Sequence, residues 1–147
     1  MISEAAVGIT GVGAHIPRYR LSAAVLGAVW GASGSGTRAV ANHDEDSLTM
    51  AVEAGLAAVG TAGGEGLDLV CLASTTAPYA EKSSAAVLAA VLDCGPGVGV
   101  ADLGGSLRAG TTGLRLAIDA IRAGSAREAL VAAADIRLAP PGSDVET

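Results

Sequence analysis

Large aromatic side chains are nearly absent from this 147-residue chain, which has no phenylalanine, two tyrosines and one tryptophan. Half of the residues are nonetheless hydrophobic, and 21 are glycines. A core made of Ala, Val, Leu and Gly cannot pack around bulky rings and depends on close approach of backbones. We therefore expect helices and sheets in tightly spaced layers, within one domain by length.

Clusters of basic residues are also missing. The chain has 9 Lys and Arg against 15 Asp and Glu, a net charge of −6, and its closest basic pair is Arg18 and Arg20. Binding to nucleic acid needs concentrated Lys and Arg to release counterions. The composition therefore excludes a nucleic-acid partner, and the acidic excess favours solubility.

Cysteines are scarce and carry no motif. Cys71 and Cys94 show neither metal-ligand spacing nor a C-x-x-C pattern, and both lie in hydrophobic runs. We expect two buried free thiols. The acidic run Asp44–Asp46 lacks the spacing of a calcium loop and instead favours capping of the helix that follows it. No metal site is predicted.

A membrane-spanning segment is not expected either. The most hydrophobic stretch, residues 85–101, is interrupted by Asp93, Pro96 and several glycines. The first residues lack the basic region of a signal peptide. These features predict a cytoplasmic protein without a membrane partner.

Hydrophobic runs alternate with helical patterns along the chain. The runs predict buried strands over Val7–Gly13, Leu67–Ala73, Val98–Leu103 and Ala129–Ala134. Hydrophobic spacing predicts helices over Ser22–Val29, Ser47–Val59, Lys82–Leu92 and Leu107–Ile121. This alternation indicates an α/β fold with a mixed, mostly parallel sheet. The last helix, rich in Ala and Gly, is expected to be the most buried one.

Two features suggest chemistry only weakly. The glycines Gly8, Gly11 and Gly13 have the wrong spacing for a dinucleotide fingerprint, and no helix start follows them. They favour a first strand packed closely against a helix. His15 and His43 are the only histidines, and nothing in the sequence places either of them beside a nucleophile.

The turn at Gly104–Gly110 is the sharpest feature. It follows a predicted strand and opens a long helix, so backbone N–H groups point at whatever the turn carries. Such a turn can lower the pKa of a nucleophile or stabilise an oxyanion. Ser106 is the candidate nucleophile, although serine needs a base and none is evident. The alternative is that Ser106 caps the helix while the glycines serve packing.

Several segments, in order along the chain, resemble the hydroxymethylglutaryl-CoA synthases, especially the archaeal and bacterial type. They are Gly11–Arg20, His43–Ala54, Ala77–Lys82, Ala101–Leu103 with Arg108–Thr111, and Ala134–Ile136. The resemblance implies a thiolase-like fold, in which two similar halves form a five-layered subunit that usually dimerises. Residues 1–147 resemble only the first half, the N-terminal half-domain. The second half would supply a catalytic histidine and an asparagine.

Two departures from the family bear on chemistry. Leu107 stands where the resemblance implies the nucleophilic cysteine, and Thr75 stands where it implies a general acid/base glutamate. Ser106 and Thr75 are therefore the candidate catalytic residues. The segment Asp102–Ser106 is similar to that of actinobacterial synthase-like proteins that often accompany an OB-fold domain.

The resemblance implies three alternatives. The chain is a divergent acyltransferase acting on acyl-CoA, with no cofactor beyond that substrate. Alternatively, it is a non-catalytic subunit that binds acyl-CoA or a partner such as an OB-fold protein. It could also be a fragment without independent function. A homodimer or a second thiolase-like half is the expected partner.

Overall fold

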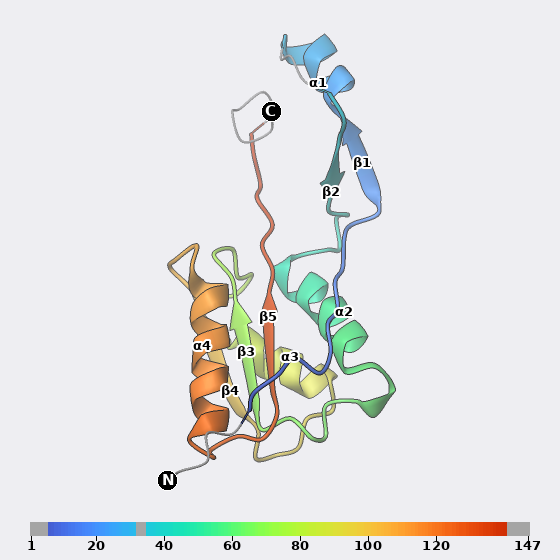
Figure 1. Ribbon diagram of the computed structural model, residues 1–147. Helices are drawn as coiled ribbons and strands as arrows, with labels where there is room; N and C mark the ends of the chain where they lie inside the picture. Colours follow the sequence, from blue (N-terminus) through green and yellow to red (C-terminus); the bar gives the residue numbers. More distant parts are fainter. Residues whose placement is uncertain (1–5, 32–34, 141–147) are drawn as a thin grey trace.

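A computed structural model describes residues 6–31 and 35–140. Its strands are β1 (Tyr19–Ser22), β2 (Thr37–Val40), β3 (Leu69–Ala73), β4 (Gly99–Leu103) and β5 (Ala129–Ala133). Its helices are α1 (Ala23–Trp30), α2 (Ser47–Val59), α3 (Ser84–Val91) and α4 (Ala109–Arg122), and a 3-10 turn η1 (Gly60–Ala62) follows α2. β1 and β2 form one small sheet, and the other three strands form the main sheet (Figure 1).

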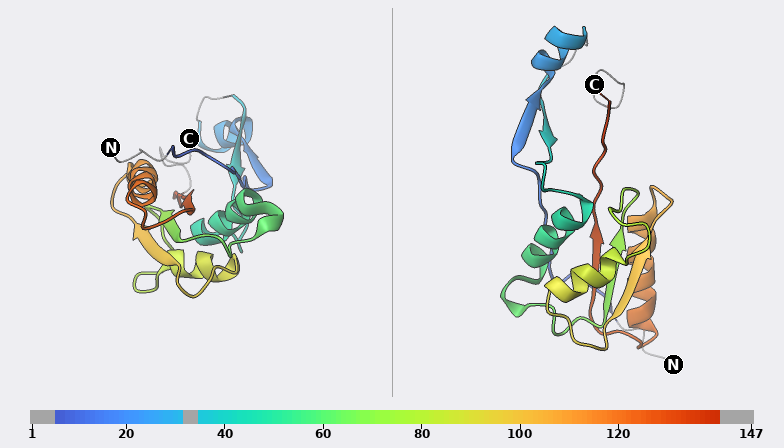
Figure 2. Two further views of the ribbon diagram at one scale, coloured as in Figure 1. Left: turned by 60° about the horizontal axis from the view of Figure 1, so that its bottom comes forward. Right: turned by 180° about the vertical axis from the view of Figure 1, so that it is seen from behind.

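The main sheet is parallel, with β3 between β4 and β5. Helices α2 and α3 cover one face and α4 covers the other (Figure 2). Side chains of β3 alternate accordingly, because successive residues of a strand point to opposite faces. Val70 and Leu72 belong to the core under α2 and α3, whereas Cys71 lies under Gly113 of α4. The α/β class predicted from the sequence is confirmed.

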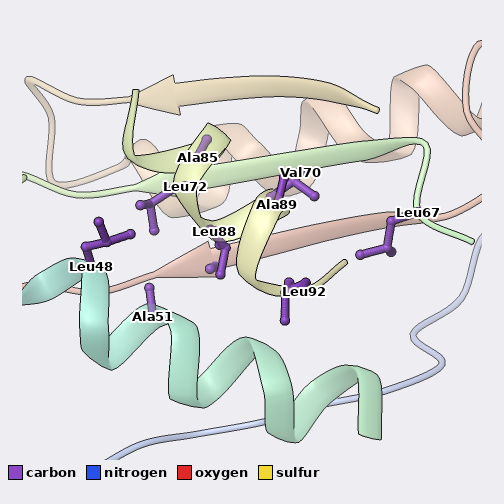
Figure 3. Packing of buried hydrophobic residues seen from close by; sticks show 10 residues of the cluster. Leu48, Ala51, Leu67, Val70, Leu72, Ala85, Leu88, Ala89 and Leu92 are labelled. Carbon is purple, nitrogen blue, oxygen red and sulfur yellow. The ribbon is translucent and has the colours of Figure 1, made fainter. Parts of the chain in front are cut away.

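The core lacks aromatic side chains, as the composition predicts. Leu88, Ala85 and Val70 are each 0 % exposed and pack between the sheet and helices α2 and α3 (Figure 3). Gly55 of α2 makes the close approach possible, since a Cβ there would lie 3.3 Å from Leu88 Cδ1. Small residues thus set the spacing of the layers.

Helix α4 is not the most buried helix, so that prediction was wrong. Only Ala109, Gly113 and Ala117 are buried on it, whereas Leu114 and Leu116 are 49 % and 44 % exposed. Helix α2 buries more of its length. The reason is that, within residues 6–31 and 35–140, α4 packs mainly on β3, β4 and β5 on one side, and its outer face carries the exposed side chains of Leu114 and Leu116.

The predicted first strand, Val7–Gly13, is extended but joins no sheet. It lies against α2, because a Cβ at Gly11 would come within 2.5 Å of Ala58 O and one at Gly13 would overlap Ala54 O. The expected close packing on a helix is therefore confirmed, and the strand assignment is wrong. Ile9 and Val12 point away from that contact and are 82 % and 80 % exposed.

Strands β1 and β2 and helix α1 form an arm that projects from the body (Figures 1 and 2). β1 and β2 pair antiparallel, and α1 lies at the tip. Ser22 caps α1 through a bond to Ala24 N, and Gly31 ends it at φ 72°. The sequence predicted this helix nearly in place but missed both strands, because each has four residues and little buried surface.

The remaining boundaries agree closely with the sequence. Helix α2 has the predicted bounds, and β3, β4 and β5 fall within the predicted runs. The predicted helices over Lys82–Leu92 and Leu107–Ile121 begin two residues later in the structure. No helix of the described chain is long and apolar enough to cross a bilayer.

Candidate functional site

The carboxyl ends of the three parallel strands meet at one edge of the main sheet. Backbone bonds tie them together, from Ser74 N to Leu103 O (3.0 Å) and from Ala134 N to Ala73 O (3.1 Å). Ligands of open parallel sheets bind outside this edge. The loops that follow β3, β4 and β5 are therefore the place to look for a site, and Thr75 and Ser106 both lie on them.

The turn between β4 and α4 carries Ser106 and Leu107. Gly105 adopts φ 70°, which a residue with a side chain rarely takes. Ser106 Oγ accepts a hydrogen bond from Arg108 N at 3.1 Å, and Ser106 O accepts one from Ala109 N. This bond closes a local turn before α4, whose N-cap is Arg108 and receives no side-chain cap bond, so the prediction that Ser106 caps the helix is not confirmed. Ser106 Oγ is the acceptor in this bond, so its own proton is not used in it.

Leu107 precedes Arg108, the N-cap of α4, and is 82 % exposed. A helix N-terminus carries a partial positive charge and free N–H groups, which favour an anion or an oxyanion. An aliphatic side chain can neither be acylated nor exchange a proton. The turn thus presents a polar backbone together with a nonpolar, accessible side chain.

Thr75 is held by Asp135, which follows β5. Thr75 N and Thr75 Oγ1 donate to Asp135 Oδ1 at 2.7 and 2.9 Å. Thr76 Oγ1 and Ser74 Oγ donate to the same oxygen at 3.1 and 3.3 Å. One carboxylate oxygen therefore holds the first three residues of the loop after β3.

The carboxyl of Asp135 stays ionised near neutral pH. Desolvation by the surrounding chain raises its pKa, but the hydrogen bonds from Thr75 N, Thr75, Thr76 and Ser74 outweigh it and hold the pKa below the usual range. An ionised carboxylate only accepts hydrogen bonds, so the hydroxyl protons of the loop must point at it. Sequence reasoning missed this role, although the segment Ala134–Ile136 carried part of the family resemblance.

Helix α2 anchors the same loop from the other side. Ser47 is buried at the start of the helix, and its Oγ donates to Thr76 O at 2.8 Å. Thr76 Oγ1 in turn accepts from Ile136 N at 2.9 Å. The loop is thus bonded to β5 and to α2, which gives Thr75 a fixed position at the edge.

The histidines make other contacts. His15 Nε2 lies 2.8 Å from Glu45 Oε1, and Glu45 Oε2 accepts from Asn42 N. The bond from Asn42 N, then that from His15, lowers the pKa of Glu45. His43 Nδ1 contacts Asn42 Oδ1. In the described part of the chain, no hydrogen bond joins either histidine to Ser106.

The acidic run before α2 serves the helix, as expected. Asp46 Oδ1 accepts from Thr49 N, and Thr49 Oγ1 accepts from Asp46 N, which completes a capping box. Within residues 6–31 and 35–140, no three potential metal ligands come together.

Both cysteines are free thiols, as predicted. Cys71 is buried in β3, and Cys94 is half-buried after α3. Burial raises the pKa of both thiols, and the charge of Asp93 raises that of Cys94 further. Protonated thiols are poor nucleophiles, so neither cysteine is suited to replace a nucleophile at residue 107.

A groove of about 680 Å³ opens beside Asp135. One wall is the segment 13–17, and the other is the extended chain 133–139 that leaves β5. The base of the arm and Met50 and Ala54 of α2 complete the lining. The groove therefore adjoins the Asp135 network rather than the turn that carries Ser106.

No family model matches the chain, but known proteins are similar to it in sequence and in fold. Hydroxymethylglutaryl-CoA synthase of Thermococcus onnurineus is 36% identical over 144 residues, which cover 95% of this chain and 41% of the relative. The Methanopyrus kandleri synthase is 34% identical over 156 residues, covering 99% and 45%. This chain is hydroxymethylglutaryl-CoA synthase-like. It spans less than half the length of these relatives and corresponds to their N-terminal half.

Solved structures give the same fold. 3-Oxoacyl-(acyl carrier protein) synthase III of Pseudomonas aeruginosa superposes with a TM-score of 0.75 and 31% identity, over 85% of this chain and 41% of that one. The Thermus thermophilus β-ketoacyl-[acyl carrier protein] synthase III reaches a TM-score of 0.80 at 24% identity, over 88% and 43%. The thiolase-like fold predicted for this synthase-like chain is confirmed.

Proposed function

We propose that this chain is part of a divergent thiolase-like acyltransferase that acts on acyl-CoA thioesters without an acyl-cysteine intermediate. Its similarity to hydroxymethylglutaryl-CoA synthases supports the substrate class. The observation that carries the proposal is the turn before α4, where exposed Leu107 stands beside the hydroxyl of Ser106.

Ser106 is the nucleophile in this proposal. Its Oγ attacks the carbonyl carbon of the thioester, the C–S bond breaks, and CoA leaves with the proton as a free thiol. Backbone N–H groups at the start of α4 stabilise the oxyanion that forms. Thr75, held by Asp135, is the polar group of the neighbouring loop. A base for Ser106 comes from the second half of the fold, since neither histidine here hydrogen-bonds to it.

The proposed partner is a second thiolase-like half, in the same polypeptide or in another, with homodimerisation as the expected assembly. Exposed hydrophobic side chains in three segments outside the helices and strands support it, because exposed hydrophobic surface is typical of an interface. Leu107 is 82 %, Leu138 90 % and Ile9 82 % exposed. The further proposal of an OB-fold partner rests only on the resemblance of Asp102–Ser106 to synthase-like proteins of that kind.

Intact-mass measurement after incubation of the chain, together with the second half that supplies the base, with acetyl-CoA and acetoacetyl-CoA tests the chemistry. We expect an acyl adduct on the wild type that is absent from Ser106→Ala and retained in Cys71→Ala and Cys94→Ala. An adduct that survives Ser106→Ala but disappears in either cysteine variant contradicts the proposal. Circular dichroism of each variant checks that the fold is retained.

A non-catalytic subunit is the second candidate. The side chain of Leu107 favours it, because this residue has no reactive atom at the helix start. It predicts that acyl-CoA binds, by isothermal titration calorimetry, while no variant acquires an adduct. Binding without acylation, also after addition of the second half, would replace the first candidate by this one.

A further inference from the structure

Three hydroxyls donate to Asp135 Oδ1, and among the described residues only that of Thr75 accepts no hydrogen bond in return. Ser74 Oγ also accepts from Thr76 N at 3.0 Å. Thr76 Oγ1 also accepts from Ile136 N at 2.9 Å. Thr75 Oγ1 donates to Asp135 at 2.9 Å and, among the described residues, accepts no hydrogen bond. It is also the residue of the three that is exposed.

The direction of the Thr75 bond is set by its partner. A carboxylate has no proton to give, so the hydroxyl proton of Thr75 points at Asp135 and its lone pairs point elsewhere. Hydrogen bonds to charged groups are stronger than those between neutral groups, so reversing this hydroxyl to donate to a ligand is unfavourable. Thr75 therefore offers an acceptor to whatever approaches the edge of the sheet.

The position of Thr75 ties this acceptor to the proposed site. Ser74 N bonds Leu103 O, and a Cβ at Gly104 would lie 3.5 Å from Ser74 O, so the loops after β3 and β4 are in contact. The helix start that follows Gly104–Arg108 presents N–H donors. One edge thus carries donors on one loop and an oriented acceptor on the next.

We infer that Thr75, oriented by Asp135, is a specificity-determining acceptor that selects acyl thioesters bearing a hydroxyl on the acyl chain over those bearing a carbonyl there. A hydroxyl on the acyl chain donates a hydrogen bond to Thr75 Oγ1. A carbonyl oxygen has no proton to donate and would instead face the lone pairs of Thr75 Oγ1, which is unfavourable. This inference rests on the proposed function, since it assumes that a CoA thioester binds at this edge. In this arrangement Thr75 contacts the ligand, and Asp135 is a positioning residue.

Three CoA esters that differ only at the third acyl carbon test the inference: 3-hydroxybutyryl-CoA, acetoacetyl-CoA and butyryl-CoA. Calorimetric titration of the full chain should give a Kd for the hydroxy ester about three- to ten-fold lower than for butyryl-CoA, as one net hydrogen bond provides. Acetoacetyl-CoA should bind no better than butyryl-CoA.

Variants separate the acceptor from a merely structural role. Thr75→Val keeps the shape and the backbone bond to Asp135, and should bind the three esters equally. Thr75→Ser should retain the preference, and Asp135→Asn should weaken it because the amide can donate to Thr75 and free its proton. Thr112→Val, on the exposed face of α4, is the matched control and should behave as wild type.

The outcomes distinguish the two proposals. Equal binding of all three esters by the wild type, or an unchanged preference in Thr75→Val, overturns the acceptor role while leaving acyl-CoA binding in place. Failure of every CoA ester to bind overturns the proposed function and this inference with it.

Discussion

Substituting alanine at two glycines of α4 gives opposite changes in stability. A Cβ at Gly113 would lie 3.0 Å from both Leu103 Cδ1 and Val131 Cγ1, and 3.8 Å from Cys71 Cβ. A Cβ at Gly110 would lie 3.5 Å from Ala133 Cβ, which is ordinary van der Waals contact. Gly110 is the second residue of α4 and Gly113 the fifth, so the two differ in how closely the sheet approaches and, to a smaller extent, in their position along the helix.

The magnitude follows from two opposing effects. Alanine stabilises a helix by roughly 1 kcal/mol relative to glycine. Overpacking a close contact destabilises by about 1–3 kcal/mol. Gly110→Ala experiences only the first effect and should raise the free energy of unfolding by roughly 0.5–1 kcal/mol. Gly113→Ala experiences both and should lower it by about 0–2 kcal/mol.

Urea denaturation followed by circular dichroism measures the difference. Fluorescence of Trp30 is unsuitable, because this residue lies on the arm rather than in the core. With an m-value of about 1–2 kcal/mol/M, the two midpoints should differ by roughly 1 M. Equal midpoints, or a more stable Gly113→Ala, would refute the claim that small residues on α4 set its distance from the sheet.

Three further outcomes are expected. Leu107→Cys should react with iodoacetamide at lower pH than Leu138→Cys, because both positions are more than 80 % exposed but only Leu107 lies at a helix N-terminus; equal pH profiles would contradict this. Asp46→Ala should lower the free energy of unfolding by about 1 kcal/mol through loss of the capping box, whereas exposed Thr112→Val should not. The pKa of Asp135 is lower in the folded chain than in the unfolded chain, where it is about 3.9. Its ionised carboxylate therefore stabilises the fold at pH values above about 3.9, and this stabilisation is lost as the pH falls through the folded pKa. The stability gap between wild type and Asp135→Asn, measured in urea, should therefore narrow from pH 7 to about pH 3, and a constant gap would speak against it.

Local patterns in the sequence predicted the elements of the body. Asp46, followed by hydrophobic spacing and Gly60, specifies a helix whose start, cap and end depend on nearby residues alone, and α2 has those bounds. β3 is also readable, because an unbroken hydrophobic run is typical of a strand buried on both faces. The two strands of the arm have no unbroken hydrophobic run in the sequence. β2 is exposed along its length, and it pairs with β1 across the intervening helix.

The candidate site was predicted only in part, because the sequence shows local patterns but not contacts between distant residues. The turn with Ser106 is contiguous in sequence, so its glycines and the helix behind it are visible there. The network at Thr75 joins residues 60 positions apart, Thr75 and Asp135, and depends on the pairing of β3 with β5. Spacing along the chain does not encode such a contact. Only the family resemblance, which covered both segments, drew attention to them.

The wrong assignment of Val7–Gly13 bears on the proposed partner. A hydrophobic run indicates that side chains become buried, whereas a β-strand also needs a neighbouring strand with which its backbone N–H and C=O groups form hydrogen bonds. Among the described residues, β5 pairs on one side only, with β3, and Val7–Gly13 lies against the helix α2 and belongs to no sheet. The groove beside Asp135 separates the continuation of this segment from the chain that leaves β5. The edge of β5 that pairs with no described strand and the exposed side chains of Ile9 and Val12 are therefore the surfaces on which the proposed second half is expected to pack.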